Sequence, residues 1–129
     1  MRTTRRLLLG TARWLALGLV LPAPLLVALE PRTRAMAAWR SLVRARESAR
    51  AIGREYLVQE PHEADRERLL ESLSAICPAE QAVSLDASEL ARRMARGVRR
   101  DFASGRTVSL RGWQLSRSEA RLCALVALE

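Results

Sequence analysis

Apolar residues recur every three to four positions from Met36 to Leu57, which is the spacing of a helix with one buried face. Trp39 and Ile52 lie on this face, and arginine and glutamate residues fill the opposite one. Pro61 removes a backbone donor and disfavours the helical conformation of the residue before it. We therefore expect one continuous helix that ends before Pro61.

A second helix is predicted to begin at Pro61 or His62 and to run to Cys77, because its apolar residues again share one face. Acidic residues near its start favour the positive end of the helix dipole, and Pro78 ends it. His62 lies among these acidic residues, and a metal site would need further ligands at suitable spacing. We interpret His62 as a solvated residue at the start of this helix.

The third predicted helix has a signal at each end. Asp86, followed by Glu89 three residues later, is a cap of the capping-box type, and Gly105 supplies a left-handed stop. Four apolar residues follow the cap at four-residue steps and define the predicted buried stripe: Leu90, Met94, Val98 and Phe102.

The period of the pattern changes after the third helix. Residues 107–110 and 113–115 alternate between apolar and polar, and Arg111-Gly112 between them fits a turn. A minimal hairpin is one interpretation, and because two strands alone are marginal in water it would have to lie on the helices. The other interpretation is an ordered loop in which Trp113 either plugs the core or serves binding.

The segment Ser116–Glu119 has the sequence of a capping box and opens a last helix. This helix is apolar around more than half of its circumference, so we expect it to be buried between other helices or against another protein. The predicted fold class is mainly α. It is a small bundle of about four helices with a short hairpin-like insert before the last one, preceded by an N-terminal signal or anchor helix.

The first 37 residues have the composition of an export signal, in which arginines precede a moderately apolar run from residue 14 to residue 29. The string Thr4-Arg5-Arg6-Leu7-Leu8-Leu9 resembles the twin-arginine (Tat) signal, in which apolar residues follow an arginine pair two and three positions later. The residues that match this pattern are Arg5, Arg6, Leu8 and Leu9.

Ala35-Met36-Ala37 has the small-x-small pattern that a signal peptidase cleaves, so we expect cleavage after Ala37. Cleavage there divides the chain into a leader, residues 1–37, and a single helical domain, residues 38–129, and it places the mature protein in the periplasm. The alternative is that the leader stays attached as an inner-membrane anchor. Its apolar run is shorter than the roughly 20 residues that span a bilayer.

The composition excludes several classes of function. All 22 basic residues are arginine, so the chain has no lysine for a Schiff base or a phosphate-binding P-loop. One histidine and two cysteines are too few for an iron–sulfur cluster. We expect no cofactor, no metal site and no enzymatic activity, with chemistry at Tyr56, His62 or an acid as the alternative.

Much of the positive charge belongs to the leader. The chain has a net charge of +8, but six arginines and one acid lie in residues 1–37. The remainder has 16 arginines against 13 acids and a net charge of +3. Nucleic-acid binding is therefore not expected.

Two further groups of residues are candidate sites. Cys77 and Cys123 both fall on apolar helical faces; in an oxidising compartment they either bridge each other, remain free thiols or bridge to a partner chain. Arginines crowd the third helix and form either a solvated face or a patch that docks an acidic partner or anionic lipid head groups. The candidate partner-binding residues are Arg92, Arg93, Arg96, Arg99, Arg100 and Trp113.

A Tat-like leader on a small helical chain, together with Ile52-Gly53-Arg54-Glu55-Tyr56-Leu57, resembles the small (gamma-type) subunits of periplasmic flavin-dependent sugar and alcohol dehydrogenases. The resemblance implies a non-catalytic accessory or escort subunit that carries the export signal for a larger oxidoreductase and helps it mature. Its partners would be that flavin-dependent subunit and the Tat translocase. The rival interpretation is a membrane-anchored protein whose arginine face meets anionic lipid or a membrane complex.

Overall fold

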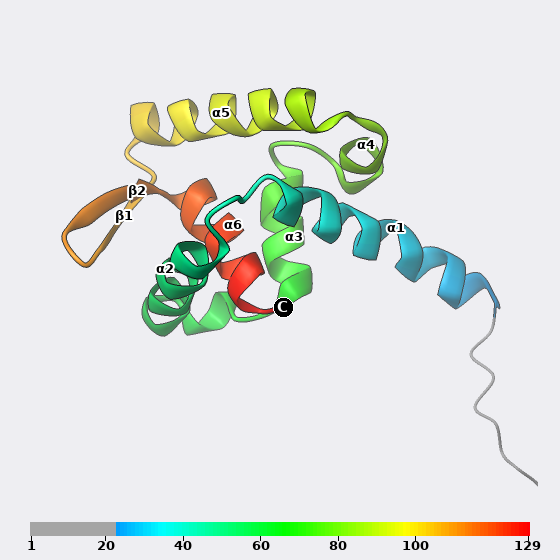
Figure 1. Ribbon diagram of the computed structural model, residues 1–129, viewed down its shortest axis with the longest axis horizontal. Coiled ribbons are helices and arrows are strands. Elements are labelled where there is room, and N and C mark those ends of the chain that lie inside the picture. The colour runs from blue at the N-terminus through cyan, green and yellow to red at the C-terminus, as the bar shows by residue number, and fades with distance from the viewer. Residues whose placement is uncertain (1–22) are drawn as a thin grey trace, which may run out of the picture.

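The computed structural model describes residues 23–129, in which helices surround one central helix and a hairpin projects from the side (Figure 1). The elements are α1 (Ala23–Ser41), α2 (Arg46–Gln59), the 3₁₀ turn η1 (Pro61–Glu63), α3 (Arg66–Ser74), α4 (Ala79–Ser84), α5 (Ala87–Ser104), β1 (Thr107–Leu110), β2 (Trp113–Ser116) and α6 (Arg117–Ala127). The mainly helical fold class is confirmed. The export-signal residues Arg5, Arg6, Leu8 and Leu9 lie outside the described residues.

The central helix is α6, which packs against α1, α2, α3 and α5 (Figure 1). Ala120, Ala124 and Leu125 of α6 are fully buried, each with 0% of its surface exposed. The apolar circumference of α6 is therefore covered by the other helices of the chain, which is the first of the two alternatives that the sequence left open.

Both ends of α6 have partners for their free backbone groups. The Ser116 hydroxyl accepts the N–H of Glu119 at 3.0 Å, and the Glu119 carboxylate accepts the N–H of Ser116 at 3.0 Å, which confirms the predicted capping box. At the other end, Arg40 Nε of α1 donates to the carbonyl of Leu125 at 3.1 Å. A cation at the carboxyl end of a helix is favoured by the helix dipole.

The pattern predicts a single first helix, and this prediction is wrong. The chain instead forms α1 and α2, with a break over residues 42–45. The N–H of Leu42 bonds to the carbonyl of Trp39 at 3.2 Å, so α1 closes in a tight turn. The break allows two helices rather than one to contact α6. Both keep their apolar faces, since Trp39 of α1 and Tyr56 of α2 are each 0% exposed.

α1 continues through the position where cleavage is expected. Ala35 is 0% exposed and Met36 is 8% exposed, and both belong to the same core cluster as Trp39. Ala37 itself is exposed, but it lies within this packed helix, which extends to Ser41.

The second predicted helix is divided as well. It opens with η1, and α3 begins only after Asp65, whose carboxylate accepts the N–H of Arg68 at 3.0 Å. α3 ends at Ser74, and the short helix α4, which the apolar pattern does not predict, follows Pro78. The leucine face of α3 is buried as expected, at Leu69, Leu70 and Leu73.

Both predicted ends of α5 are confirmed. The Asp86 carboxylate accepts the N–H of Glu89 at 2.8 Å, and Gly105 adopts the left-handed conformation with φ of 73°. These local signals therefore place the helix correctly.

The predicted buried stripe of α5 is correct at its start and wrong at its end. Leu90 and Met94 are buried, but Phe102 is 48% exposed. A helix turns by about 100° per residue, so three steps of four residues rotate Phe102 by about 120° away from Leu90. Gly97 and Asp101 complete the buried stripe instead.

Residues 107–116 form the predicted hairpin, with Leu110 opposite Trp113 across the antiparallel strands. Arg111 has φ of 49° and Gly112 has φ of 79°, which suits a two-residue type I′ turn. The turn fixes the register and hence the position of Trp113.

Candidate functional site

The hairpin and α2 enclose an apolar groove with a volume of about 410 Å³, which we call the hairpin groove. Its lining includes Ile52, Glu55, Leu110, Arg111, Trp113 and Leu115. Its walls are mostly apolar with a polar rim, so the hairpin groove is suited to receive an apolar side chain of a partner.

Trp113 is an exposed large apolar residue at the hairpin groove. It is 76% exposed, although its cross-strand neighbour Leu110 is only 2% exposed. Opposed residues point to the same face of a hairpin, so Leu110 reaches the core and Trp113 extends beyond its edge. The interpretation of Trp113 as a core plug is therefore wrong.

Two contacts hold the hairpin against α2. Gln59 Nε2 donates to the carbonyl of Ser109 at 3.0 Å, and Arg111 Nε donates to the Glu55 carboxylate at 2.9 Å. An exposed ion pair such as the second contributes little to stability. It does place one charge of each sign at the rim of the hairpin groove.

A buried charged cluster joins α2, η1 and α6. The Glu63 carboxylate accepts hydrogen bonds from the Tyr56 hydroxyl at 2.6 Å and from Arg121 Nε and Nη2 at 3.0 and 2.8 Å. The hydrogen bonds from Arg121 lower the pKa of Glu63 to about 2, and burial raises the pKa of Tyr56 to about 12. At neutral pH the carboxylate is charged and the phenol protonated, so the cluster is a fixed structural contact.

His62 lies at the surface beside this cluster, with 65% of its side chain exposed. Its Nδ1 is 3.5 Å from the Glu60 carboxylate and its Nε2 is 4.0 Å from that of Glu63. Within residues 23–129, no group of three or more histidine, cysteine and acidic side chains is placed to hold a metal ion.

Cys77 and Cys123 are both free thiols, so the structure contains no internal disulfide between them. Cys77 is buried, and its Sγ lies 3.7 Å from Arg93 Nη1. Burial and the Glu119 carboxylate raise the pKa of Cys123 to about 11. A thiol with so high a pKa is a weak nucleophile at neutral pH.

The arginines of α5 fall into two groups. Glu89 forms ion pairs with Arg92, Arg93 and Arg96, at 3.0, 3.4 and 3.5 Å. Arg99 and Arg100 are exposed and have no acidic partner in the part of the chain that the structure describes. Positive charge is therefore partly compensated at the start of α5, where one carboxylate meets three arginines, and uncompensated at Arg99 and Arg100.

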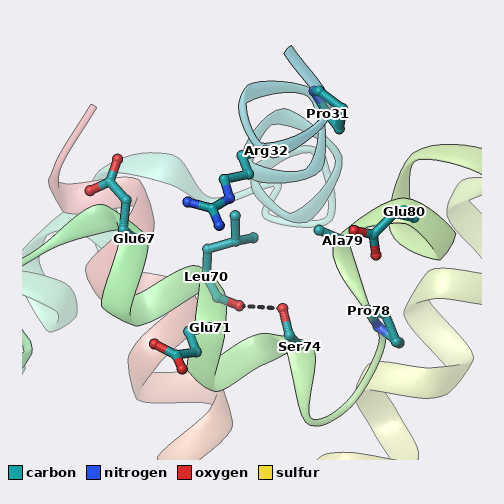
Figure 2. A pocket seen from close by; sticks show the side chains of 9 residues that line it. All are labelled: Pro31, Arg32, Glu67, Leu70, Glu71, Ser74, Pro78, Ala79 and Glu80. Atoms are coloured by element: carbon teal, nitrogen blue, oxygen red, sulfur yellow. Dashed lines mark hydrogen bonds between the residues drawn. The ribbon is translucent and has the colours of Figure 1, made fainter. Parts of the chain in front are cut away.

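A second hollow, of about 640 Å³, lies between α1, α3 and α4 (Figure 2). Arg32 of α1 lies over Leu70 of α3 (Figure 2). The carboxylates of Glu67 and Glu71 point away from Leu70. These charged residues are exposed, so the hollow is open to solvent and its carboxylates do not converge on one point.

Sequence reasoning selects Trp113 but not the residues of α2 that complete the hairpin groove. Ile52 and Glu55 precede Trp113 by about sixty residues. Alternation between apolar and polar residues identifies the apolar face of the hairpin. No local signal identifies the helix that this face meets, because the contact is tertiary.

Comparisons with family models, with curated proteins and with solved structures find no match to this chain. Over residues 23–129, none of the helices combines the length and the apolar character needed to cross a bilayer. The leader and the surfaces of the chain are therefore the features that bear on its function.

Proposed function

We propose that the protein is a non-catalytic accessory subunit that is exported through the Tat translocase and escorts a larger periplasmic oxidoreductase of the flavin-dependent kind. The Tat-like residues Arg5 and Arg6 support export, and the resemblance over Ile52–Leu57 supports the class of partner. The observation that carries the proposal is Trp113, which is 76% exposed on a rigid hairpin beside the hairpin groove.

An exposed tryptophan in this position suits a protein interface. Trp113 contributes little to the core of the isolated chain because most of its surface faces water. Tryptophan is enriched among the residues that dominate binding energy, and truncating one at the centre of an interface costs about 2–4 kcal/mol. The apolar hairpin groove and its rim pair, Glu55 and Arg111, match an interface with an apolar centre and a polar edge.

A non-catalytic role is supported by how the ionisable residues are used. Tyr56, Glu63 and Arg121 are bonded to one another inside the fold. Both free thiols are partly or fully buried. These contacts stabilise the fold and leave the partner to supply the chemistry.

The test is affinity purification of the exported, tagged chain from its natural host, with mass spectrometry to identify what co-purifies. We expect an oxidoreductase subunit with the native chain and its loss, by about thirtyfold or more, with Trp113→Ala. Phe102→Ala is the matched control, because Phe102 is a half-exposed aromatic residue on α5 that does not line the hairpin groove. The control should retain the partner.

Trp113→Ala should keep the melting temperature of the native chain, because Trp113 is 76% exposed, and Phe102→Ala should lower it only slightly, because Phe102 is half-exposed. Retention of the partner by Trp113→Ala would show that the hairpin groove is not the interface. A partner that is not an oxidoreductase, or turnover by the purified chain alone, would contradict the proposed function itself.

A further inference from the structure

The outer side of α5 carries a continuous positive surface, which we call the arginine face: Arg92, Arg96, Arg99, Arg100 and the following Arg106. Arg96, Arg99, Arg100 and Ala103 line a shallow hollow of about 540 Å³. An adjoining hollow of about 580 Å³ is lined by Arg100, Ala103, Ser104 and Arg106. Both are open depressions along one side of the helix.

The fold itself does not account for this concentration of charge. Glu89 compensates only part of the charge at the start of the arginine face, because its one carboxylate is shared by Arg92 and Arg96. Asp101 is 3% exposed, accepts the N–H of Ser118 at 2.9 Å and pairs with Arg106 at 3.2 Å. Arg99 and Arg100 have no such partner within residues 23–129, and Arg96 repels Arg100 four residues on. Like charges spaced in this way destabilise a helix slightly.

We propose that the arginine face docks on the surface of an anionic phospholipid bilayer, with its guanidinium groups on the lipid phosphates. Arginine presents a planar fork of donors that matches phosphate in a bidentate manner. α5 is 18 residues long, which gives about 27 Å at 1.5 Å per residue. It lies along the outer edge of residues 23–129, and none of the elements that the structure describes there covers its outer side (Figure 1).

The shape of the arginine face favours a bilayer over an acidic peptide. Many peptide-binding domains hold the side chains of their peptide in a groove, whereas the hollows around Ala103 are open depressions. A row of arginines along an exposed helix instead contacts many head groups of a flat surface at once, and each arginine near such a surface contributes about 1 kcal/mol.

Phe102 supplies the apolar element that interfacial helices use. It is 48% exposed and, three residues from Arg99, lies about 60° around the helix from it. An aromatic side chain at the edge of a basic face can enter the boundary between head groups and acyl chains. With the arginine face on the bilayer, the exposed ring of Phe102 would enter this boundary.

The experiment measures binding of the full chain to vesicles of phosphatidylcholine alone and to vesicles of phosphatidylcholine mixed with phosphatidylglycerol. Arg99→Ser combined with Arg100→Ser should lower the partition coefficient on the anionic vesicles by about thirtyfold. Arg44→Ser with Arg54→Ser is the control, because it removes the same charge from exposed residues outside the arginine face. The control should bind the anionic vesicles nearly as well as the native chain.

The comparison among variants on the same anionic vesicles separates the arginine face from the leader, because the leader is identical in all of them. Equal loss in both double variants would show that only net charge matters and would overturn the proposal. No loss in either would overturn it as well. Unchanged vesicle binding, with loss of binding to soluble polyglutamate, would assign the arginine face to an acidic protein instead. None of these results depends on the oxidoreductase partner.

Discussion

Gly53 lies where the backbones of α2 and α6 come closest. A Cβ atom placed there would lie 2.2 Å from the carbonyl oxygen of Cys123, 2.6 Å from its carbonyl carbon and 2.8 Å from the nitrogen of Ala124. These are backbone atoms of the central helix, so they cannot rotate out of the way. Gly53→Ala therefore requires the two helices to move apart.

The size of the effect follows from two opposing contributions. Alanine is favoured over glycine in a helix interior by about 1 kcal/mol. Against this, restoring an ordinary contact distance requires a separation of about 1 Å, and a gap of about that size forfeits up to half of each dispersion contact across the interface. Overpacking costs about 1–3 kcal/mol or more. Since rigid backbone is involved, we expect the overpacking cost to reach about 3 kcal/mol, and subtracting the alanine preference leaves a net loss of about 2 kcal/mol in the free energy of unfolding of Gly53→Ala.

Urea denaturation and thermal melting followed by circular dichroism measure this change, which corresponds to a fall in Tm of about 10 °C or more. Gly97→Ala is the matched control. Its Cβ would lie 2.9 Å from Cδ1 of Ile76, the end of a side chain that can change rotamer. The control should stay within about 1 kcal/mol of the native chain. A Gly53→Ala variant as stable as the native chain would refute the close packing of α2 on α6.

Two further predictions concern the charged cluster and the leader. Glu63→Gln leaves the Arg121 guanidinium without its carboxylate and should lower the free energy of unfolding by about 3 kcal/mol in urea denaturation. The folded-state pKa of Glu63 is about 2 against an ordinary value of 4.5, so its contribution is present above pH 4.5, is lost as pH falls towards 2, and should be absent from the variant. Arg5→Lys with Arg6→Lys should abolish export; periplasmic protein found on cell fractionation would remove the Tat interpretation.

Features set by nearby residues could be predicted from the sequence. The caps at Asp86 and Ser116 depend on a partner three residues away, and the stop at Gly105 depends on its own φ. The hairpin at residues 107–116 follows from alternation and a two-residue turn. In each case the determining interaction spans no more than ten residues, so the local sequence is enough to predict the feature.

Features set by tertiary contact could not be predicted. The break between α1 and α2 contains neither proline nor glycine, and it follows from the packing of both helices on α6. Glu63 and Arg121 are 58 residues apart, and nothing local pairs them. The exposure of Phe102 is a different case, because the rotation of about 100° per residue already places it off the buried stripe.

The packing of α1 bears on where the leader ends. On the proposed Tat route, which moves folded proteins, a protease at the far side of the membrane would meet Ala35 and Met36 already in the core. Proteases cut exposed, flexible chain most readily, and Ala37 lies inside a helix. Loss of a buried methionine alone costs about 2–5 kcal/mol. Cleavage after Ala37 stays a prediction, but the core that α1 builds with Trp39 favours either a cut closer to the N-terminus or a leader that remains attached.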